Sequence, residues 1–134
     1  MAIQPLRRSI LLMVLLFAAF LANGCSQQPA STAEKLLGQW EEIGISATYT
    51  HNRSEISVNP MDVVYTFHHD GAAEQVKPIG NLSYQYKLDD NYLLLSRPDG
   101  VVETMEIMEI GTNDMIWKND MNVFTHLRRK AKRH

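Results

Sequence analysis

Short segments that alternate between apolar and polar residues run from residue 62 to residue 129, and this pattern most constrains the fold. The clearest example has apolar or aromatic side chains at every second position, at Leu82, Tyr84, Tyr86 and Leu88. A period of two is typical of a β-strand with one buried face. Asp70-Gly71, between two such segments, is a strong signal for a hairpin turn. We therefore predict strands at residues 38–43, 62–68, 72–77, 82–88, 92–96, 101–110, 114–118 and 121–129.

The predicted fold is all-β: an eight-stranded antiparallel up-and-down barrel preceded by a short N-terminal helical turn. Links of two to four residues between most of the strands favour pairing of consecutive strands. Eight antiparallel strands avoid exposed edges best by closing into a barrel. Ser31 and Glu34 have the spacing of a helix capping box, and Gly38 limits this helix to one or two turns.

Two segments depart from the regular pattern. Within residues 101–110, three glutamates recur at a spacing of three, which one face of a regular strand cannot accommodate, so we predict a β-bulge near Ile107 or Met108. Residues 44–61 show no clean alternation and contain the Asn59-Pro60 break. We interpret them as a long connection with room for one short edge strand, of the kind that commonly carries function.

The first 25 residues have the organisation of a secretory signal. Arg7 and Arg8 form a positive start, and residues 10–22 are an apolar run of roughly 13 residues, short of the ~20 needed for a membrane-spanning helix. Residues 22–25, Ala-Asn-Gly-Cys, resemble the bacterial lipobox, which implies cleavage before Cys25 and acylation of its sulfur with a lipid such as palmitate. We predict a lipoprotein held at a membrane by acylated Cys25.

These features define the predicted organisation of the chain. Residues 1–24 are a lipoprotein signal peptide, 25–31 the acylated cysteine and a flexible tether, 32–129 a β-barrel, and 130–134 a basic tail. Ser26 follows the cysteine where an aspartate would favour the inner membrane. The resemblance therefore implies a bacterial cell-envelope protein that, in a cell with two membranes, is held on the outer rather than the inner membrane and faces the periplasm.

Charge and cysteine content exclude several kinds of function. Residues 26–127 carry 15 acidic against six basic residues, a net charge near −9, whereas the last seven residues carry five basic ones. An acidic body argues against nucleic acid as a partner, because binding phosphates needs a basic surface. Cys25 is the only cysteine, so once it is acylated no thiol is left for a disulfide, a zinc site or a nucleophile.

Three motifs together resemble the small bacterial lipocalin-like domains of the calycin group. They are Leu37-Gly38-Gln39-Trp40 at the first strand, residues 65–71 at the first tight hairpin, and the basic end of the last strand. The resemblance covers residues 36–129. It implies that Trp40 closes one end of the barrel and that an arginine from the last strand packs across its ring. Strand parity leaves Arg128 and Arg129 open for that role.

The sequence offers no pattern typical of a catalytic or metal site. His68 and His69 are adjacent in or beside a strand, so their side chains point to opposite sides rather than to one ion. There is no Gly-x-Ser-x-Gly elbow and no glycine-rich phosphate loop. We therefore expect no enzymatic activity, no metal and no cofactor.

A set of aromatic and methionine side chains on the predicted strands is able to line an apolar pocket. These residues are Tyr65, Phe67, Tyr84, Tyr86, Met105, Met115, Trp117 and Phe124. The same residues are what a filled barrel core requires in so small a domain. We favour the filled core over the pocket.

The sequence thus leads to two hypotheses about function. The first is a membrane-anchored lipocalin-like protein, without catalysis, that binds a small apolar or amphipathic molecule in or at the mouth of its barrel. The alternative is a cell-envelope protein-binding module, an inhibitor or an assembly or stress accessory, that uses the 44–61 loop and the acidic surface to bind a basic partner.

Overall fold

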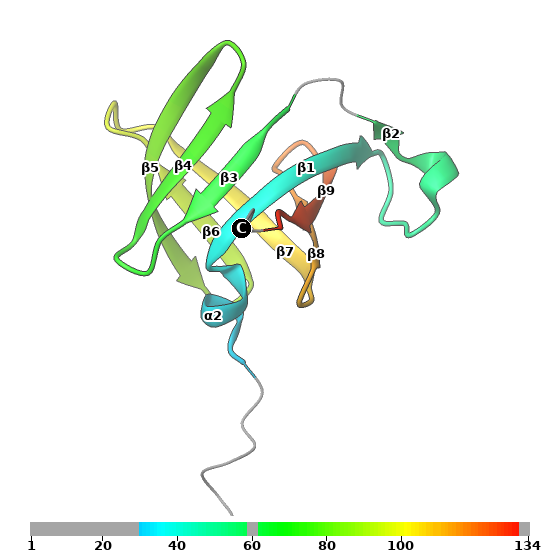
Figure 1. Cartoon of the computed structure of the whole chain (residues 1–134), viewed down its shortest axis with the longest axis horizontal. Coiled ribbons are helices and arrows are strands. Elements are labelled where there is room, and N and C mark those ends of the chain that lie inside the picture. Colours follow the sequence, from blue (N-terminus) through cyan, green and yellow to red (C-terminus); the bar gives the residue numbers. More distant parts are fainter. Residues whose placement is uncertain (1–29, 59–61, 132–134) are drawn as a thin grey trace, which may run out of the picture. The chain divides into compact units, whose positions relative to one another are not determined.

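The computed structural model describes residues 30–58 and 62–131 (Figure 1). The predicted signal peptide, Cys25 and most of the tether lie outside the described residues, as does the end of the basic tail. The described ranges hold these elements: α2 (Thr32–Leu36), β1 (Gly38–Ser46), η1 (Arg53–Glu55), β2 (Ser57–Val58), β3 (Val64–Phe67), β4 (Ala72–Lys77), β5 (Gly80–Asp89), β6 (Tyr92–Ser96), β7 (Val102–Ile110), β8 (Asp114–Lys118) and β9 (Phe124–Arg129). In this part of the chain no helix has the length and apolar character to span a bilayer.

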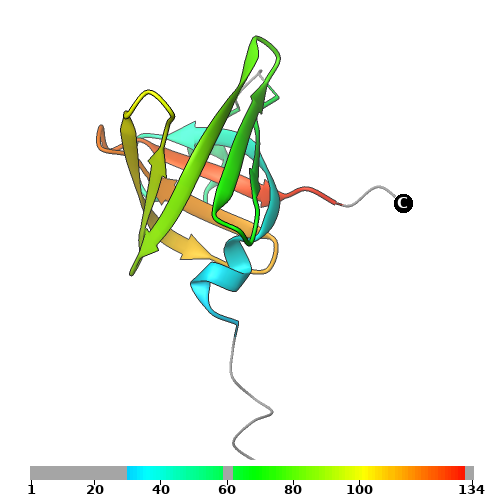
Figure 2. The ribbon, with the colours of Figure 1, turned by 90° about the vertical axis from the view of Figure 1, so that its left-hand side faces the viewer.

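The strands form a closed antiparallel barrel, which confirms the predicted fold class. Strands β3 to β9 pair in chain order, β1 pairs with β3 on one side, and β1 also pairs with β9 to close the sheet (Figure 2). The two-residue strand β2 adds to the edge of β1 beyond the end of β3, through Gly44 and Ile45. It lies within the segment interpreted from the sequence as a long connection.

Two β-bulges change which side chains face the barrel interior. The register between β7 and β8 shifts between Ile107 and Glu109, where the sequence predicts a bulge. The register between β1 and β9 shifts between Glu42 and Gly44, which the sequence did not predict. Because two residues of β1 there oppose one on β9, the second half of β1 turns its other face outward.

The interior of the barrel is filled with side chains. Its largest fully buried members include Trp40, Trp117 and Phe67. The Tyr65 and Trp117 rings meet edge to face with centroids 4.9 Å apart, and the Phe67 and Tyr86 rings meet similarly at 5.3 Å. Such contacts stabilise a core beyond the area they bury. Tyr84 and Met115 are also buried in this cluster, and Met105 packs against it.

A buried glutamine satisfies the hydroxyl groups of two interior tyrosines. Gln75 donates from Nε2 to the Tyr65 hydroxyl at 2.7 Å and accepts from the Tyr84 hydroxyl at 3.3 Å. Burial raises the pKa of both phenols, with the charge of Glu42 adding to the effect at Tyr65. Both phenols therefore stay neutral, and the polar groups of this interior pair with one another.

Arg129 and α2 close one end of the barrel around Trp40. The indole Nε1 donates to the Leu36 carbonyl at 2.9 Å, and the Arg129 guanidinium lies 4.3 Å from the centre of the Trp40 ring. A Cβ on Gly38, which has φ +107°, would lie 2.9 Å from the Arg129 guanidinium. The structure thus places Arg129 on the indole, and Arg128 instead pairs with Glu41 on the outside at 2.9 Å.

Candidate functional site

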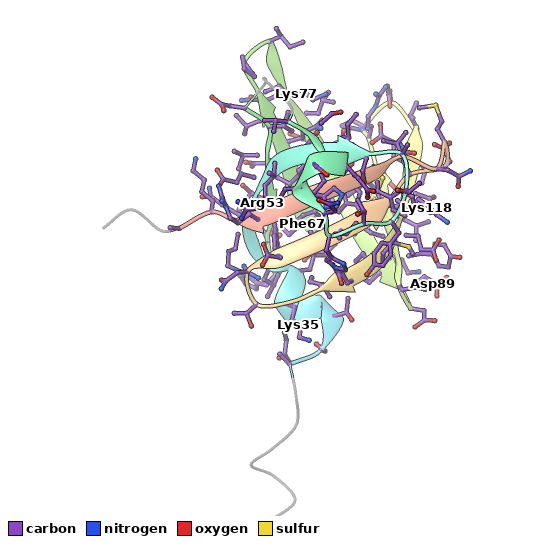
Figure 3. The ribbon with its side chains drawn as sticks, turned by 90° about the vertical axis from the view of Figure 1, so that its right-hand side faces the viewer. Lys35, Arg53, Phe67, Lys77, Asp89 and Lys118 are labelled. Atoms are coloured by element: carbon purple, nitrogen blue, oxygen red, sulfur yellow. The ribbon has the colours of Figure 1, made fainter. Side chains whose placement is uncertain are left out.

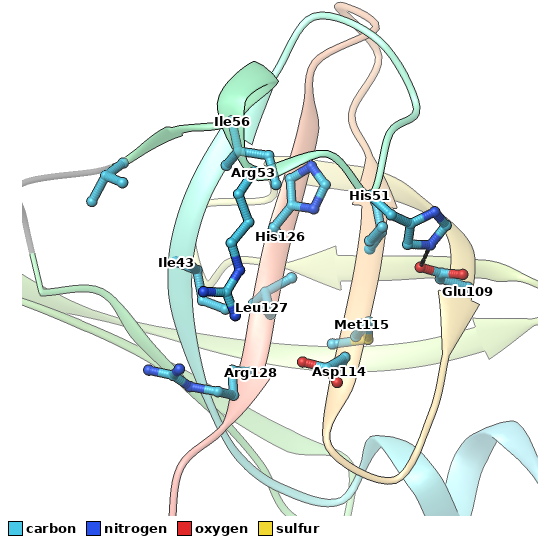
Figure 4. Close-up of a pocket in the computed structure, with 12 residues that line it drawn as sticks. Ile43, His51, Arg53, Ile56, Glu109, Asp114, Met115, His126, Leu127 and Arg128 are labelled. Carbon is cyan, nitrogen blue, oxygen red and sulfur yellow. Dashed lines mark hydrogen bonds and ion pairs between the residues drawn. The ribbon is translucent and has the colours of Figure 1, made fainter.

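A hollow of about 330 Å³ lies outside the barrel, between residues 47–58 and the outer face of β1, β8 and β9 (Figure 4). Residues 47–58 are called the covering segment below. Figure 3 shows the η1 segment, with Arg53, crossing in front of these strands, while Lys77, Asp89 and Lys118 project elsewhere around the barrel. The lining residues are Ile43, His51, Arg53, Ile56, Val58, Glu109, Asp114, Met115, Ile116, His126, Leu127 and Arg128. Six of the twelve are aliphatic or methionine and six are polar or charged, so the lining combines apolar and polar groups, although Met115 and Leu127 also belong to the barrel core.

Part of the outer face of β8 and β9 is buried although it points away from the barrel interior. Ile116, Phe124 and His126 are 4%, 9% and 6% exposed. In the β8–β9 register, Thr125 pairs with the interior Trp117, so its neighbours Phe124 and His126 lie on the opposite face. The Phe124 ring instead lies 6.1 Å from that of Tyr49 in the covering segment. The expectation that Phe124 faces the barrel interior was therefore wrong.

Gly44 allows the covering segment to lie this close to β1. A Cβ at this position would lie 2.4 Å from the Ser57 carbonyl oxygen and 2.8 Å from Cγ2 of Ile56. Backbone atoms of a paired strand cannot move aside cheaply, so a larger residue would displace β2. At the start of the segment the Ser46 hydroxyl donates to the Thr48 carbonyl at 2.8 Å.

Side-chain caps fix the short helix η1 that carries Arg53. Asn52 Oδ1 accepts hydrogen bonds from the Ser54 amide at 3.1 Å and from the Ser54 hydroxyl at 2.9 Å. Thr50 Oγ1 accepts from the Asn52 amide at 3.0 Å. Asparagine and threonine oxygens are common partners for the free amides of such turns. The Arg53 side chain extends from η1 into the hollow toward Ile43 and Leu127 (Figure 4).

Glu109 joins the covering segment to β7. Its carboxylate accepts a hydrogen bond from the Tyr49 hydroxyl at 2.9 Å, and its other oxygen lies 2.6 Å from His51 Nε2. The bond to Glu109 raises the pKa of Tyr49, so the phenol stays protonated and keeps donating. The Tyr49 and His51 rings also meet edge to face at 5.4 Å. These contacts hold the segment over the hollow.

His126 lies beneath the segment as a neutral imidazole. Burial lowers its pKa from the ordinary 6.5, the neighbouring His51 lowers it further, and Glu109 opposes the shift. Its Nε2 lies 2.8 Å from the Ser46 hydroxyl. Since that hydroxyl has one hydrogen and donates it to Thr48, Nε2 of His126 must carry the proton and donate to Ser46. The imidazole is thus held in one tautomer.

The histidines considered in the sequence do not gather around an ion. The described residues contain no group of three or more His, Cys, Asp or Glu placed to hold a metal. His68 is exposed and lies 3.9 Å from Glu74, which is a surface contact. Of the residues predicted as ligand-lining, only Met115 borders the hollow.

Most residues of this site were missed by sequence reasoning. Its charged member Arg53 and its aliphatic wall fall in the irregular segment or on outward strand positions. The available signal was the parity of β9: counting back from an inward Arg129 puts Leu127 and Thr125 inside and His126 outside. Without the fold, parity could not decide between Arg128 and Arg129.

Two solved structures share this fold. A lipocalin-like protein from Bacteroides uniformis ATCC 8492 matches 72% of this chain and 99% of its own, with a TM-score of 0.57 and 13% identity. An uncharacterized protein from Bacteroides eggerthii DSM 20697 matches 71% and 99%, with a TM-score of 0.53 and 12% identity. At these identities the similarity shows the fold alone, and the chain has a lipocalin-like barrel. Scans against protein-family models and curated proteins give no match.

Proposed function

We propose that this protein is a lipid-anchored, lipocalin-like binding protein without enzymatic activity, and that the hollow beneath residues 47–58 takes a small apolar or amphipathic molecule. The main support is the contrast between a filled barrel interior and a hollow of about 330 Å³ beside it, whose lining is partly apolar. Ligand pockets commonly measure ~300–1,000 Å³ and combine apolar walls with a few polar groups. The hollow fits the lower end of that range.

The proposed site lies outside the barrel, whereas the hypothesis from the sequence put the ligand in the barrel or at its mouth. The interior aromatic rings contact one another at centroid distances of 4.9 to 6.5 Å, and Gln75 occupies the polar space between Tyr65 and Tyr84. An interior ligand would have to displace these side chains, which costs packing energy. A ligand in the hollow would only add contacts.

The anchor belongs to the same proposal. Cys25 follows a lipobox-like sequence and precedes the barrel by a short polar tether, so acylation would hold the binding domain beside a membrane. Ser26 favours the outer membrane and its periplasmic face. Labelling cells with radioactive palmitate tests this: label should enter the protein and should be absent from Cys25→Ser. Label that persists in the variant would exclude acylation at Cys25.

Blocking the hollow tests the binding function. Ile43→Trp places a large ring in the hollow, whereas Val102→Trp changes an exposed position on β7 that does not line it. We expect saturable binding of an environment-sensitive apolar dye to the parent and to Val102→Trp, and loss of that binding in Ile43→Trp. Dye binding that persists in Ile43→Trp would mean that the dye binds outside the hollow. Absence of dye binding by the parent would contradict the proposed function.

A second candidate function is recognition of a protein partner by the same segment. It is favoured by exposed apolar side chains there, since Val58 is 75% and Tyr49 44% exposed, next to an acidic barrel. Val58→Asp would weaken capture of such a partner, whereas Ile43→Trp, which blocks the hollow and leaves Val58 in place, should abolish dye binding and leave that capture intact. A partner recovered equally by the parent and Val58→Asp would count against this candidate.

A further inference from the structure

We propose that the hollow selects small amphipathic monoanions, with Arg53 binding the carboxylate of the ligand and the β1–β9 wall packing against its apolar part. This inference rests on the proposed function, and it adds the chemical class of the ligand.

Arg53 is the one arginine of residues 30–58 and 62–131 whose guanidinium has no hydrogen-bond or ion-pair partner among these residues. Arg97 pairs with Asp99, and Arg128 pairs with Glu41. Arg129 donates to backbone carbonyl groups and stacks on Trp40. None of the ion pairs or side-chain hydrogen bonds among the described residues involves the Arg53 guanidinium, although fifteen acidic residues are present. A fork of donors is therefore free at the edge of the hollow.

The position of that guanidinium suits a ligand with a charged end and an apolar body. Caps from Asn52 and Thr50 fix the turn that carries Arg53, and the side chain points toward Ile43 and Leu127 (Figure 4). Guanidinium groups bind carboxylates through two parallel hydrogen bonds, which are stronger than neutral ones. A carboxylate held there directs the rest of the ligand along the aliphatic wall.

The other charges around the hollow limit the ligand to a single negative charge. Glu109 is held by Tyr49 and His51, and the Arg128 charge is balanced by Glu41. The Asp114 carboxylate also lines the hollow, without an ion pair among the described residues, and would repel a second carboxylate. The lining therefore combines one cation without an ion pair, Arg53, with one carboxylate without an ion pair, Asp114, which lies opposite Arg128 in the β8–β9 register.

Four eight-carbon probes separate charge from apolar binding: octanoate, octanol, octylamine and octanedioate. They are titrated by calorimetry into the full-length protein in lipid nanodiscs, with empty nanodiscs measuring partition into the lipid. We expect octanoate to bind about tenfold more tightly than octanol, and octylamine and octanedioate to bind more weakly than octanoate. Arg53→Gln should make octanoate and octanol equal, and Arg53→Lys should keep part of the preference. Lys87→Gln removes an exposed charge away from the hollow and should change nothing.

The outcomes distinguish this inference from the function on which it rests. If none of the probes binds, the proposed function fails and the inference fails with it. If octanoate, octanol and octylamine bind alike, the hollow is a binding site but the selection of anions is wrong. If octanoate binds preferentially and Arg53→Gln leaves that preference intact, the carboxylate binds elsewhere. Thermal unfolding of Arg53→Gln should match the parent, because the exposed guanidinium has no partner to lose in the part of the chain that the structure describes.

Discussion

The guanidinium carbon of Arg129 lies 4.3 Å from the centre of the Trp40 ring, at the end of the barrel beside α2. The same guanidinium donates to the carbonyl oxygens of Leu37 at 2.6 Å and Thr112 at 2.7 Å, and also to that of Lys35. One side chain therefore joins the first and last strands, the turn before β8 and the end of α2. This arrangement makes Arg129 a structural residue, whereas its neighbour Arg128 faces outward.

Replacing Arg129 with alanine should destabilise the barrel strongly. The change removes the contact with Trp40 and leaves several carbonyl groups without their donor, so the free energy of unfolding should fall by roughly 2–4 kcal/mol. Urea unfolding followed by tryptophan fluorescence measures this. Arg128→Ala is the matched control, since it breaks only an exposed ion pair with Glu41 and should cost less than about 1 kcal/mol. Equal losses in the two variants would contradict the structural role of Arg129.

Most of the barrel was predictable because its signals are local. Asp70-Gly71 fixes a hairpin by its own turn chemistry, and the alternation at 82–88 follows from one buried face. The bulge in β1 has no such local signal. Gly44 and Ser46 lie on the outer face and are nonetheless buried, because residues 47–58 cover them. A strand covered on both faces loses its alternation, and for this reason the end of β1 was interpreted as part of a connection.

Gly44→Ala should detach the covering segment while leaving the barrel folded. The added methyl group would contact the Ser57 carbonyl, so β2 would have to separate from β1, at a cost of about 1–3 kcal/mol. Amide hydrogen exchange should rise in residues 47–58, and ligand binding in the hollow should be lost. In Gly111→Ala the methyl group would lie 3.6 Å from the Asp114 carbonyl, an ordinary contact, so this control should behave like the parent. Unchanged exchange in Gly44→Ala would contradict the close approach.

His126 should make the stability of the protein depend on pH below the ordinary histidine pKa of 6.5. Its folded-state pKa is lowered, so both states are neutral above 6.5 and the group contributes no difference. As the pH falls below 6.5, the unfolded chain binds the proton first, and the free energy of unfolding decreases until the folded-state pKa is reached. Urea unfolding across this range should show a flatter pH dependence in His126→Asn than in the parent.

Two further variants make the assignment to His126 specific. His51 and Glu109 face His126 and affect its pKa in opposite directions, so His51→Asn should narrow the pH range over which stability is lost. His68→Asn alters an exposed histidine that does not line the hollow, and this variant should keep the parental pH dependence. A slope unchanged in His126→Asn would show that other groups cause the dependence.

The candidate site was less predictable than the fold because it depends on contacts between distant segments. Arg53 and Ile56 come from the irregular connection, and Ile116 and His126 from outward positions of β8 and β9. Outward positions on a barrel normally meet solvent, so nothing local marks them as part of a pocket. The sequence did indicate residues 44–61 as a segment able to carry function, and the hollow lies beneath residues 47–58 of it.

Asp114→Asn should broaden and strengthen the binding of anions in the hollow. Asp114→Asn removes one negative charge from the lining of the hollow, so octanoate should bind several-fold more tightly and octanedioate should become a ligand. Calorimetry with both acids measures the change, and added salt should reduce it because the interaction is partly exposed. Asp89→Asn makes the same charge change on β5, outside the hollow, and should leave both affinities at the parental values. Equal gains in the two variants would mean that the net charge of the protein, rather than the Asp114 carboxylate in the lining of the hollow, governs the affinity of the site for anions.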